Sequence, residues 1–175
     1  MGGGKPGRML CGQPLVAWPA AALAQVCPRV AVVAKAGEEL PALAGVERWD
    51  EPDEPRHPLT GIVHALERAG GARVLVCAAD MPFVTADACR AVGAGLGEGV
   101  AAAVAVADGV VQPVFAAYAP SALGALRAAR PDAPLTSTVR ALDPVLVEVD
   151  AETVRSVDTP EDLARAEAEL GLRGG

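Results

Sequence analysis

The clearest signals for helix and strand lie in residues 58–97, PLTGIVHALERAGGARVLVCAADMPFVTADACRAVGAGLG. Residues 58–70 predict a helix, because apolar residues recur on one face and a proline stands in the first turn. Residues 73–79, RVLVCAA, predict the strongest strand of the chain, and residues 85–97 predict another helix with Thr85 as its N-cap. A strand between two helices indicates an α/β protein.

The alternation of helices and strands continues on both sides of this stretch. Residues 14–26 predict a helix that Pro19 could kink, and Asp108-Gly109 predicts a hairpin turn. The other predicted elements are strands at 30–34 and 46–49, a poor helix at 38–43, helices at 122–129 and 136–142, a strand at 144–150, and a last helix opened by Thr159 and Pro160. We therefore expect one domain, residues 1–175, with a three-layer α/β/α fold and a mostly parallel sheet that has an antiparallel edge.

Composition and charge exclude several classes of protein. A hydrophobic content of 51% suits a packed core, and a net charge of −7 without a basic stripe argues against nucleic-acid binding. The sequence has no signal peptide and no run of about 18 apolar residues, so we expect a cytoplasmic protein that does not enter a membrane.

No CxxC pair occurs, which argues against a zinc site. Lys5 and Lys35 are the only lysines, so few cations are present to meet an anion.

Two aspartates follow predicted strands at the places where α/β sheets bind ligands. Asp80 comes directly after residues 73–79, and Asp50 follows residues 46–49. An unpaired buried carboxylate is costly, so Asp80 either binds Mg²⁺ that bridges to phosphate oxygens or accepts hydrogen bonds from the amides of its own turn. Asp50 either binds a ribose hydroxyl or a base edge, or is one of several solvated acidic residues in the segment DEPDEPRH.

Two further segments have a residue pattern that suits ligand binding. The opening MGGGKPGRMLCGQPL combines glycines, which let backbone amides approach an anion, with the ammonium group of Lys5. It is not a Walker loop, because proline follows the lysine, and a flexible chain end is the alternative. Gln112 precedes Pro113 in the second hairpin strand, where proline breaks a ladder and indicates an edge or a bulge that directs the amide of Gln112 to a ligand.

The motifs MGGGK, GQPL, WDEP, HPLTG, CAADMPF, VQP and SVDTPEDL occur in this order. Together they resemble the molybdenum cofactor guanylyltransferases, a family of nucleotidyltransferases with a Rossmann-like fold. The resemblance covers essentially the whole chain. HPLTG, ADMPF and SVDTPEDL at these separations are specific together, although each alone would be weak.

The resemblance leaves two ways to align the opening segment. The family begins with a strand and the loop LAGGxSxRMGxxK, followed by GxPL. If Arg8-Met9 is the family's Arg-Met pair, the motif lysine is deleted. If Met1-Gly2 is the Met-Gly pair, Lys5 is the motif lysine and the spacing to GQPL fits, so we prefer this alignment. It implies that the family's first strand and the LAGGxSxR loop, about 15 to 20 residues, precede Met1.

The resemblance implies an enzyme that transfers GMP from GTP to the phosphate of a molybdopterin cofactor and releases pyrophosphate. It makes Lys5 and Asp80 the catalytic residues: Lys5 would neutralise the triphosphate, and Asp80 would hold Mg²⁺, the implied cofactor. Val33 and Asp50 would also bind the nucleotide. Molybdoenzyme-maturation proteins are candidate partners, whereas nucleic acid and membranes are not. The candidates for the pterin side are Gln112, Ser156 and Asp158.

Several residues depart from the family pattern and leave the substrate open. Ser156 and Asp158 stand where the family often has two asparagines, and Asp158 adds a negative charge there. His57 replaces a glycine at a helix start, and Gly4 stands where an aspartate often precedes the lysine. The alternatives are a cytidylyltransferase on the same pterin, a nucleotidyltransferase for a sugar or polyol phosphate, a non-catalytic nucleotide-binding module, and a purely structural domain.

Overall fold

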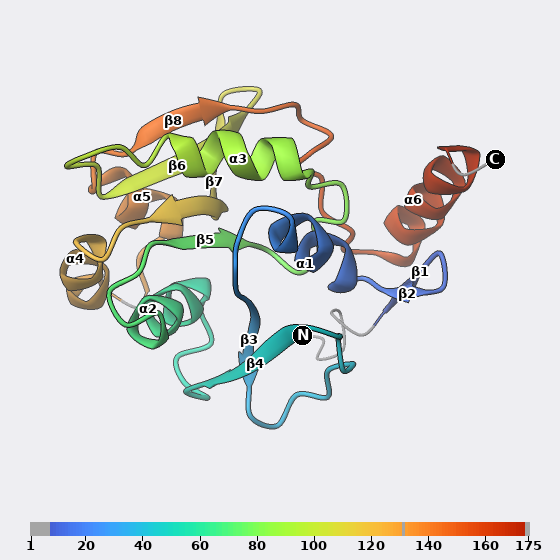
Figure 1. The fold of residues 1–175 in the computed structure, drawn as a ribbon, viewed down its shortest axis with the longest axis horizontal. Coiled ribbons are helices and arrows are strands. Elements are labelled where there is room, and N and C mark those ends of the chain that lie inside the picture. The colour runs from blue at the N-terminus through green and yellow to red at the C-terminus, as the bar shows by residue number, and fades with distance from the viewer. Residues whose placement is uncertain (1–7, 131, 174–175) are drawn as a thin grey trace.

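The computed structural model describes residues 8–130 and 132–173 (Figure 1). The strands are β1 (Met9–Leu10), β2 (Gln13–Pro14), β3 (Val30–Lys35), β4 (Val46–Glu51), β5 (Val74–Cys77), β6 (Ala102–Ala107), β7 (Val110–Tyr118) and β8 (Val145–Glu148). The helices are α1 (Ala17–Ala24), α2 (Pro58–Arg68), α3 (Ala86–Ala94), α4 (Ala122–Ala128), α5 (Leu135–Arg140) and α6 (Pro160–Arg173). None of the helices in these ranges combines the length and the apolar character that a membrane crossing requires.

The strands of the described residues form three sheets. β1 and β2 form an antiparallel pair, β3 and β4 form a parallel pair, and a four-stranded sheet has the order β5-β7-β6-β8. β8 is parallel to β6, whereas β7 is antiparallel to both of its neighbours. The α/β class is confirmed, but the antiparallel strand lies inside the sheet and not at its edge. The tight hairpin at Asp108-Gly109, with positive φ angles of 49° and 74°, sets β7 beside β6, and the other edge of β7 pairs with β5.

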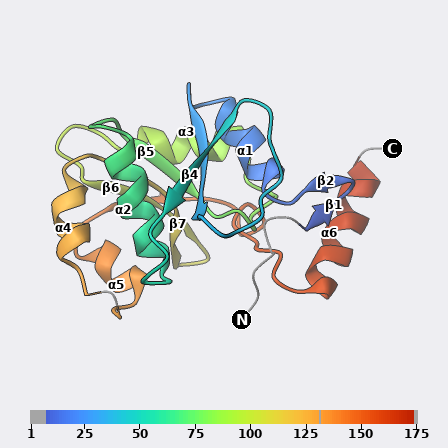
Figure 2. The same cartoon turned by 90° about the horizontal axis from the view of Figure 1, so that it is seen from below.

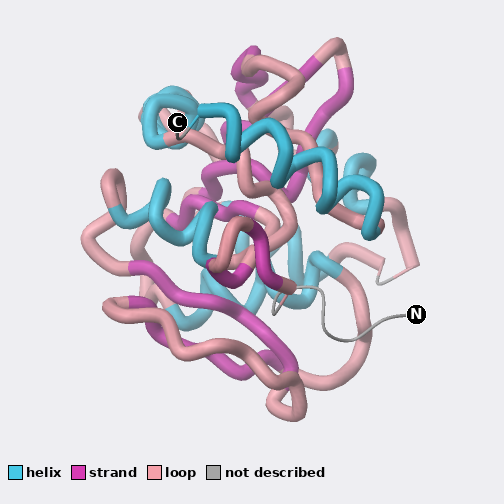
Figure 3. The backbone as a smooth tube through the Cα atoms, turned by 90° about the vertical axis from the view of Figure 1, so that its right-hand side faces the viewer, coloured by secondary structure: helices cyan, strands magenta, loops and turns pink. Residues whose placement is uncertain are grey.

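Helices cover both faces of the four-stranded sheet and make the three layers (Figures 1 and 3). Successive residues of β6 point to opposite faces. One face packs against α2, α4 and α5, and its buried residues include Ala102, Val104, Val106, Leu59, Ile62, Leu66, Leu126 and Val139. The other face packs against α1 and α3, and its buried residues include Ala103, Ala105, Ala22, Cys89 and Val92. The strand is therefore apolar throughout, as a strand covered on both sides must be.

Two predicted features of the chain upstream of β4 differ from the structure. Helix α1 begins at Ala17, so Pro19 lies in the first turn, where its missing N–H group leaves no hydrogen bond unmade and no kink is needed. Residues 38–43 form no helix, because Pro41 interrupts a segment that is already short. The segment instead runs as a loop between β3 and β4.

Pro113 occupies a bulge of β7, as its sequence context predicted. Val104 of β6 pairs with Ala116, but the next residue, Ala105, pairs with Gln112. The extra residues of β7 lie between these two pairs, so the ladder does not require the N–H group that proline lacks. The hydroxyl of Tyr118, which is fully buried, donates to the carbonyl of Pro113 at 2.7 Å and closes the bulge.

Replacing Tyr118 with phenylalanine tests this bulge. We expect Tyr118→Phe to lower the free energy of unfolding by about 1–3 kcal/mol, because the buried carbonyl of Pro113 loses its donor while the ring still fills the core. Urea unfolding followed by circular dichroism measures the change. Val110→Ala, at an exposed position of the same strand, is the control and should change stability by less than about 0.5 kcal/mol. Equal stability of Tyr118→Phe and the unmodified protein would contradict a structural role for this hydrogen bond.

Candidate functional site

A buried ion pair closes the carboxyl end of the β3–β4 pair. Lys35 and Glu51 are register partners, and the Lys35 Nζ atom lies 3.2 Å from the Glu51 Oε1 atom. Their side chains are only 10% and 13% exposed, and Lys35 also donates to the carbonyl of Pro52. Sequence reasoning noted Lys35 only for the rarity of lysine and did not single out Glu51, because the pairing depends on a strand register that no motif reveals.

The glycine of the HPLTG motif lets helix α2 approach this ion pair. The Glu51 Oε2 atom is buried and has no hydrogen-bond partner among the described residues. A Cβ atom on Gly61 would lie 3.2 Å from that oxygen and 3.8 Å from the Val33 side chain. Val33, a predicted nucleotide-binding residue, therefore faces α2 together with Glu51.

Asp50 lies on the other face of the β3–β4 pair. Neighbouring residues of a strand alternate between faces, so the Asp50 side chain points away from Glu51 and α2. Arg48 donates to the Asp50 Oδ1 atom at 2.6 Å and also to the carbonyls of Lys35 and Glu38, at 2.9 and 2.8 Å. Asp50 thus orients Arg48, which holds the turn after β3. The predicted nucleotide-binding residues Val33 and Asp50 therefore lie on opposite faces of the β3–β4 pair.

Asp80 lies in a half-buried turn that joins distant parts of the chain. Its carbonyl accepts a hydrogen bond from the Val157 N–H group at 2.8 Å, so residues 156–158 lie against the Asp80 turn. The Ser156 hydroxyl donates to the Asp158 Oδ2 atom at 2.8 Å, and Arg8 Nη1 donates to the Asp158 carbonyl at 2.9 Å. The structure therefore brings Asp80 together with two predicted pterin-side residues and with Arg8. Sequence analysis considered Arg8 only in one of the two alignments of the opening segment.

A small hydrophobic cluster holds the DMPF and SVDTPEDL motifs together. Phe83 and Val157 pack in one cluster with Leu10, Leu15 and Ala166, which brings the β1–β2 hairpin and α6 to the Asp80 turn (Figure 1). The guanidinium carbon of Arg155 lies 4.1 Å from the centroid of the Phe83 ring, and Arg155 forms an ion pair with Glu169 of α6. Packing thus fixes the positions of two motifs that lie far apart in sequence.

Helix α6 is held at its start by a reciprocal cap. The Thr159 N–H and hydroxyl groups donate to the Asp162 Oδ2 atom at 3.0 and 2.8 Å, and the Thr159 hydroxyl oxygen accepts from the Asp162 N–H group at 3.1 Å. The hydrogen bonds from Thr159 lower the pKa of Asp162, so this carboxylate stays ionised and holds the cap. The TPEDL part of the motif therefore has a structural role.

The end of β5 beside Asp80 is apolar. Burial raises the pKa of the Cys77 thiol, and the nearby groups Cys89 and Asp80 raise it further. Cys77 therefore adds an uncharged thiol to this end of the strand. Gln112 lies at the same end of the sheet as Asp80. β5 and β7 are antiparallel and Cys77 pairs with Phe115, so the residues of β7 that precede Phe115 extend past the carboxyl end of β5. Lys5 lies outside the described residues, so its role remains a prediction.

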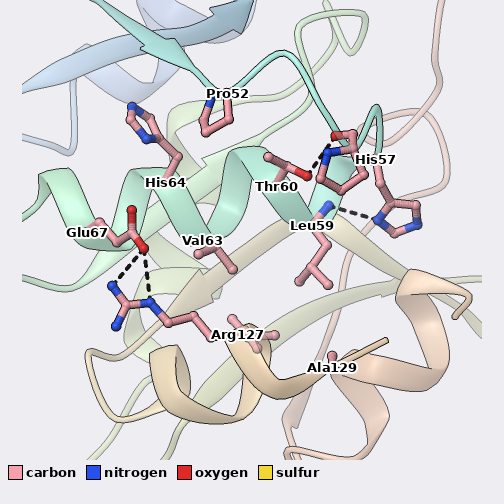
Figure 4. Close-up of a pocket in the computed structure, with 11 residues that line it drawn as sticks. Pro52, His57, Leu59, Thr60, Val63, His64, Glu67, Arg127 and Ala129 are labelled. Carbon is pink, nitrogen blue, oxygen red and sulfur yellow. Dashed lines mark hydrogen bonds and ion pairs between the residues drawn. The ribbon is translucent and has the colours of Figure 1, made fainter. Parts of the chain in front are cut away.

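A pocket of about 250 Å³ lies between α2 and α4, on the side of α2 where His57 begins the helix (Figure 4). His57 is the N-cap of α2, and its Nδ1 atom accepts from the Leu59 N–H group at 3.2 Å. Glu67 and Arg127 form an ion pair at the far end of the pocket, at 2.7 Å. No residue predicted to bind nucleotide or pterin lines this pocket, so the candidate site rests on the strand ends.

The buried pair Lys35–Glu51 gives a test of the β3–β4 end. We expect Glu51→Ala to lower the free energy of unfolding by about 3–5 kcal/mol, because the variant leaves the Lys35 ammonium group buried beside a single carbonyl. The double variant Lys35→Met/Glu51→Leu should recover most of the loss, since it removes both charges. Urea unfolding measures both variants. Asp132→Ala, which removes an exposed ion pair, serves as the control and should cost less than about 1 kcal/mol. A loss from Glu51→Ala no larger than that of the control would contradict the buried pair.

Comparisons with known proteins identify the family of this chain. Residues 1–145 match the family model described as the MobA-like NTP transferase domain. No curated protein sequence matches the chain significantly. Solved structures with a similar fold include molybdopterin-guanine dinucleotide biosynthesis protein A from Archaeoglobus fulgidus, with 24% identity and a TM-score of 0.68 over 96% of this chain and 91% of that one.

Two further solved structures have a similar fold. The 2-C-methyl-D-erythritol 4-phosphate cytidylyltransferase from Thermus thermophilus is 24% identical, with a TM-score of 0.74 over 96% of this chain and 94% of that one. CMP:2-keto-3-deoxy-manno-octonic acid synthetase, solved in complex with CTP, is 13% identical, with a TM-score of 0.76 over 97% and 92% of the two chains. These structural similarities establish the Rossmann-like fold, and the family match over residues 1–145 establishes the class of enzyme. The chain belongs to the MobA-like NTP transferase domain family and is a nucleotidyltransferase.

Proposed function

We propose that this nucleotidyltransferase transfers GMP from GTP to the phosphate of a molybdopterin-type cofactor and releases pyrophosphate. The observation that carries the proposal is the meeting of three segments at Asp80. The Asp80 carbonyl is bonded to Val157, and Arg8, three residues after Lys5, is bonded to Asp158. Arg8, the Asp80 turn and the candidate acceptor-side residues therefore lie together.

The reaction brings two anions into contact, so positioning and charge neutralisation dominate its catalysis. An oxygen of the acceptor phosphate attacks the α-phosphorus of GTP, the bond from that phosphorus to the β-phosphate oxygen breaks, and pyrophosphate leaves. This displacement requires no nucleophile from the protein. Lys5 would neutralise the triphosphate, and Arg8 holds the backbone of the acceptor-side segment through the Asp158 carbonyl.

Asp80 is suited to hold Mg²⁺ together with a nucleotide. Among residues 8–130 and 132–173, no group of three His, Cys, Asp or Glu side chains is arranged to bind a metal alone. Mg²⁺ commonly takes only one or two protein carboxylates, with substrate phosphates and water as its other ligands. A half-buried aspartate at the end of a strand fits that requirement. When bound, Mg²⁺ would stabilise the charge that develops on the phosphate oxygens.

The nucleotide side of the site would be the carboxyl end of the β3–β4 pair. Val33 faces α2 and would offer an apolar contact, whereas Asp50 lies on the opposite face beside Arg48. Asp50 would contact ribose or guanine through the carboxylate that Arg48 orients. Gln112, Ser156 and Asp158 would meet the acceptor on the other side of Asp80. The cytoplasmic location stays a prediction.

A second candidate function is cytidylyl transfer, or transfer to a sugar or polyol phosphate. The structural similarity to the 2-C-methyl-D-erythritol 4-phosphate cytidylyltransferase from Thermus thermophilus, with a TM-score of 0.74, favours this alternative. Pyrophosphate release from GTP and from CTP, each with and without molybdopterin, distinguishes the two candidates.

Replacing Asp80 tests the proposed metal ligand. We expect Asp80→Ala to reduce transfer on the order of 100-fold or more, because the metal and its phosphates lose their anchor. Pyrophosphate release with GTP, Mg²⁺ and molybdopterin measures the rate, and circular dichroism reports whether the variant folds. The control is Glu98→Gln, which changes an exposed residue before the start of β6. This variant should transfer at the original rate. A folded Asp80→Ala variant with unchanged transfer would overturn the assignment, and an unfolded one would make Asp80 a structural residue.

Replacing Lys5 tests the proposed phosphate contact. We expect Lys5→Ala to weaken GTP binding by about tenfold or more but GMP binding much less, because an ammonium group at the β- and γ-phosphates does not contact a monophosphate. Calorimetric titration with each nucleotide in the presence of Mg²⁺ measures both affinities. An equal loss for GTP and GMP would place Lys5 away from the terminal phosphates.

A further inference from the structure

Residues 156–158, the acceptor-side segment of the proposed site, belong to no helix or strand. They lie between the turn at residues 151–154 and the start of α6, which projects from the body of the molecule beside the β1–β2 hairpin (Figure 2). The Val157 N–H group donates to the Asp80 carbonyl at 2.8 Å. A single hydrogen bond contributes only about 0.5–1.5 kcal/mol to stability, so the position of the segment also depends on the side chains beside it.

Arg155, which directly precedes this segment, contacts three parts of the chain. Its guanidinium carbon lies 4.1 Å from the ring centroid of Phe83 in the Asp80 turn. Its Nη1 atom donates to the Glu169 Oε1 atom at 3.0 Å and its Nη2 atom donates to the Glu169 Oε2 atom, so a bidentate ion pair joins it to α6. Its backbone N–H group donates to the Glu152 carbonyl at 3.2 Å. One residue therefore contacts the Asp80 turn, α6 and the turn before the segment.

The Arg155–Glu169 ion pair is partly protected from water. Its side chains are 31% and 33% exposed, whereas those of the surface pair Arg90–Asp87 are 54% and 93% exposed. Salt screens a partly buried pair less than an exposed one. The planar guanidinium group also loses less conformational freedom per hydrogen bond when it binds one carboxylate through two N–H groups and stacks on a ring. This pair can therefore hold α6 and the segment in a fixed relative position, which an exposed pair does only weakly.

Arg155 also neutralises carboxylates that face one another across the segment. It interacts electrostatically with Glu169, Glu152 and Asp162. Glu152 lies in the turn before the segment, whereas Asp162 and Glu169 lie on α6. Like charges on the two sides repel each other when no cation lies between them. Arg155 therefore joins α6 to the turn both through its hydrogen bonds and by cancelling this repulsion.

We propose that Arg155 is a positioning residue that holds the acceptor-side segment against the Asp80 turn, so that the acceptor meets its contacts in a fixed place. This inference rests on the proposed function, in which residues of that segment meet the acceptor. The Asp80 turn depends less on Arg155, because Met81 and Val84 are buried in the core cluster that packs against α1 and α3. Replacing Arg155 should therefore loosen the acceptor side of the site and leave the nucleotide side intact.

Pyrophosphate release at varied GTP and molybdopterin concentrations tests the inference. We expect Arg155→Met, which keeps an unbranched apolar side chain beside Phe83 but removes the charge, to raise the KM for molybdopterin by about tenfold or more. The KM for GTP should change by less than about twofold. Arg155→Lys keeps the cation and should recover most of the loss. The control Arg127→Met breaks a surface ion pair between α4 and α2 and should change neither constant. A residue that only stabilised the fold would not separate the two constants.

Hydrogen exchange followed by mass spectrometry tests the same inference without substrates. We expect Arg155→Met to speed exchange of residues 156–158 by about tenfold or more and to leave β5 unchanged, because only the acceptor-side segment loses its support. Unchanged exchange of the segment, equal rises of both KM values, or no rise in either would overturn the inference without affecting the proposed reaction. If the unmodified chain releases no pyrophosphate from GTP with molybdopterin, the proposed function fails, and hydrogen exchange alone then decides whether Arg155 holds the segment.

Discussion

The hydrogen bond from the Val157 N–H group to the Asp80 carbonyl, 2.8 Å long, is the contact on which the site depends. It fixes the turn after the strongest predicted strand against a segment that comes near the end of the chain. Phe83 in the same turn packs with Val157, Leu10 and Ala166, so the β1–β2 hairpin and α6 are held at the same place. One turn therefore joins the catalytic aspartate of the proposed mechanism to the acceptor-side residues.

Local signals in the sequence predicted most of the elements. Helix α3 begins where Thr85 was expected to cap it, because the Thr85 hydroxyl oxygen accepts from the Ala88 N–H group at 3.2 Å. The hairpin at Asp108-Gly109 was also predicted, since two residues with positive φ favour this pair. The position of β7 inside the sheet was not predicted. The residues of a hairpin turn predict that the two strands it joins are neighbours. They do not predict which strand pairs with the other edge of the second strand.

The same limit applies to the candidate site. Asp80 was identified from its place after an apolar strand, which is a local signal, and its contact with residues 156–158 agrees with the resemblance that linked them. The pairing of Lys35 with Glu51 was missed, because it follows from the register of two strands with a long loop between them. Once that register is known, simple alternation places Val33 and Asp50 on opposite faces. Single motifs therefore indicated segments of which some lie together in the structure, but not how their side chains divide between the two faces.

The proposed site falls into two halves, and no strand ladder joins them within residues 8–130 and 132–173. The nucleotide half lies at the ends of β3 and β4, and the acceptor half lies at the Asp80 turn that follows β5. Transfer requires the α-phosphate to be held within reach of the acceptor phosphate, and small errors in position cost large factors in rate. Helix α2 packs against β3, β4 and β5, so the helix that carries the HPLTG motif contacts strands of both halves. The distance between the nucleotide and the acceptor in the proposed site therefore depends on how α2 packs against these strands.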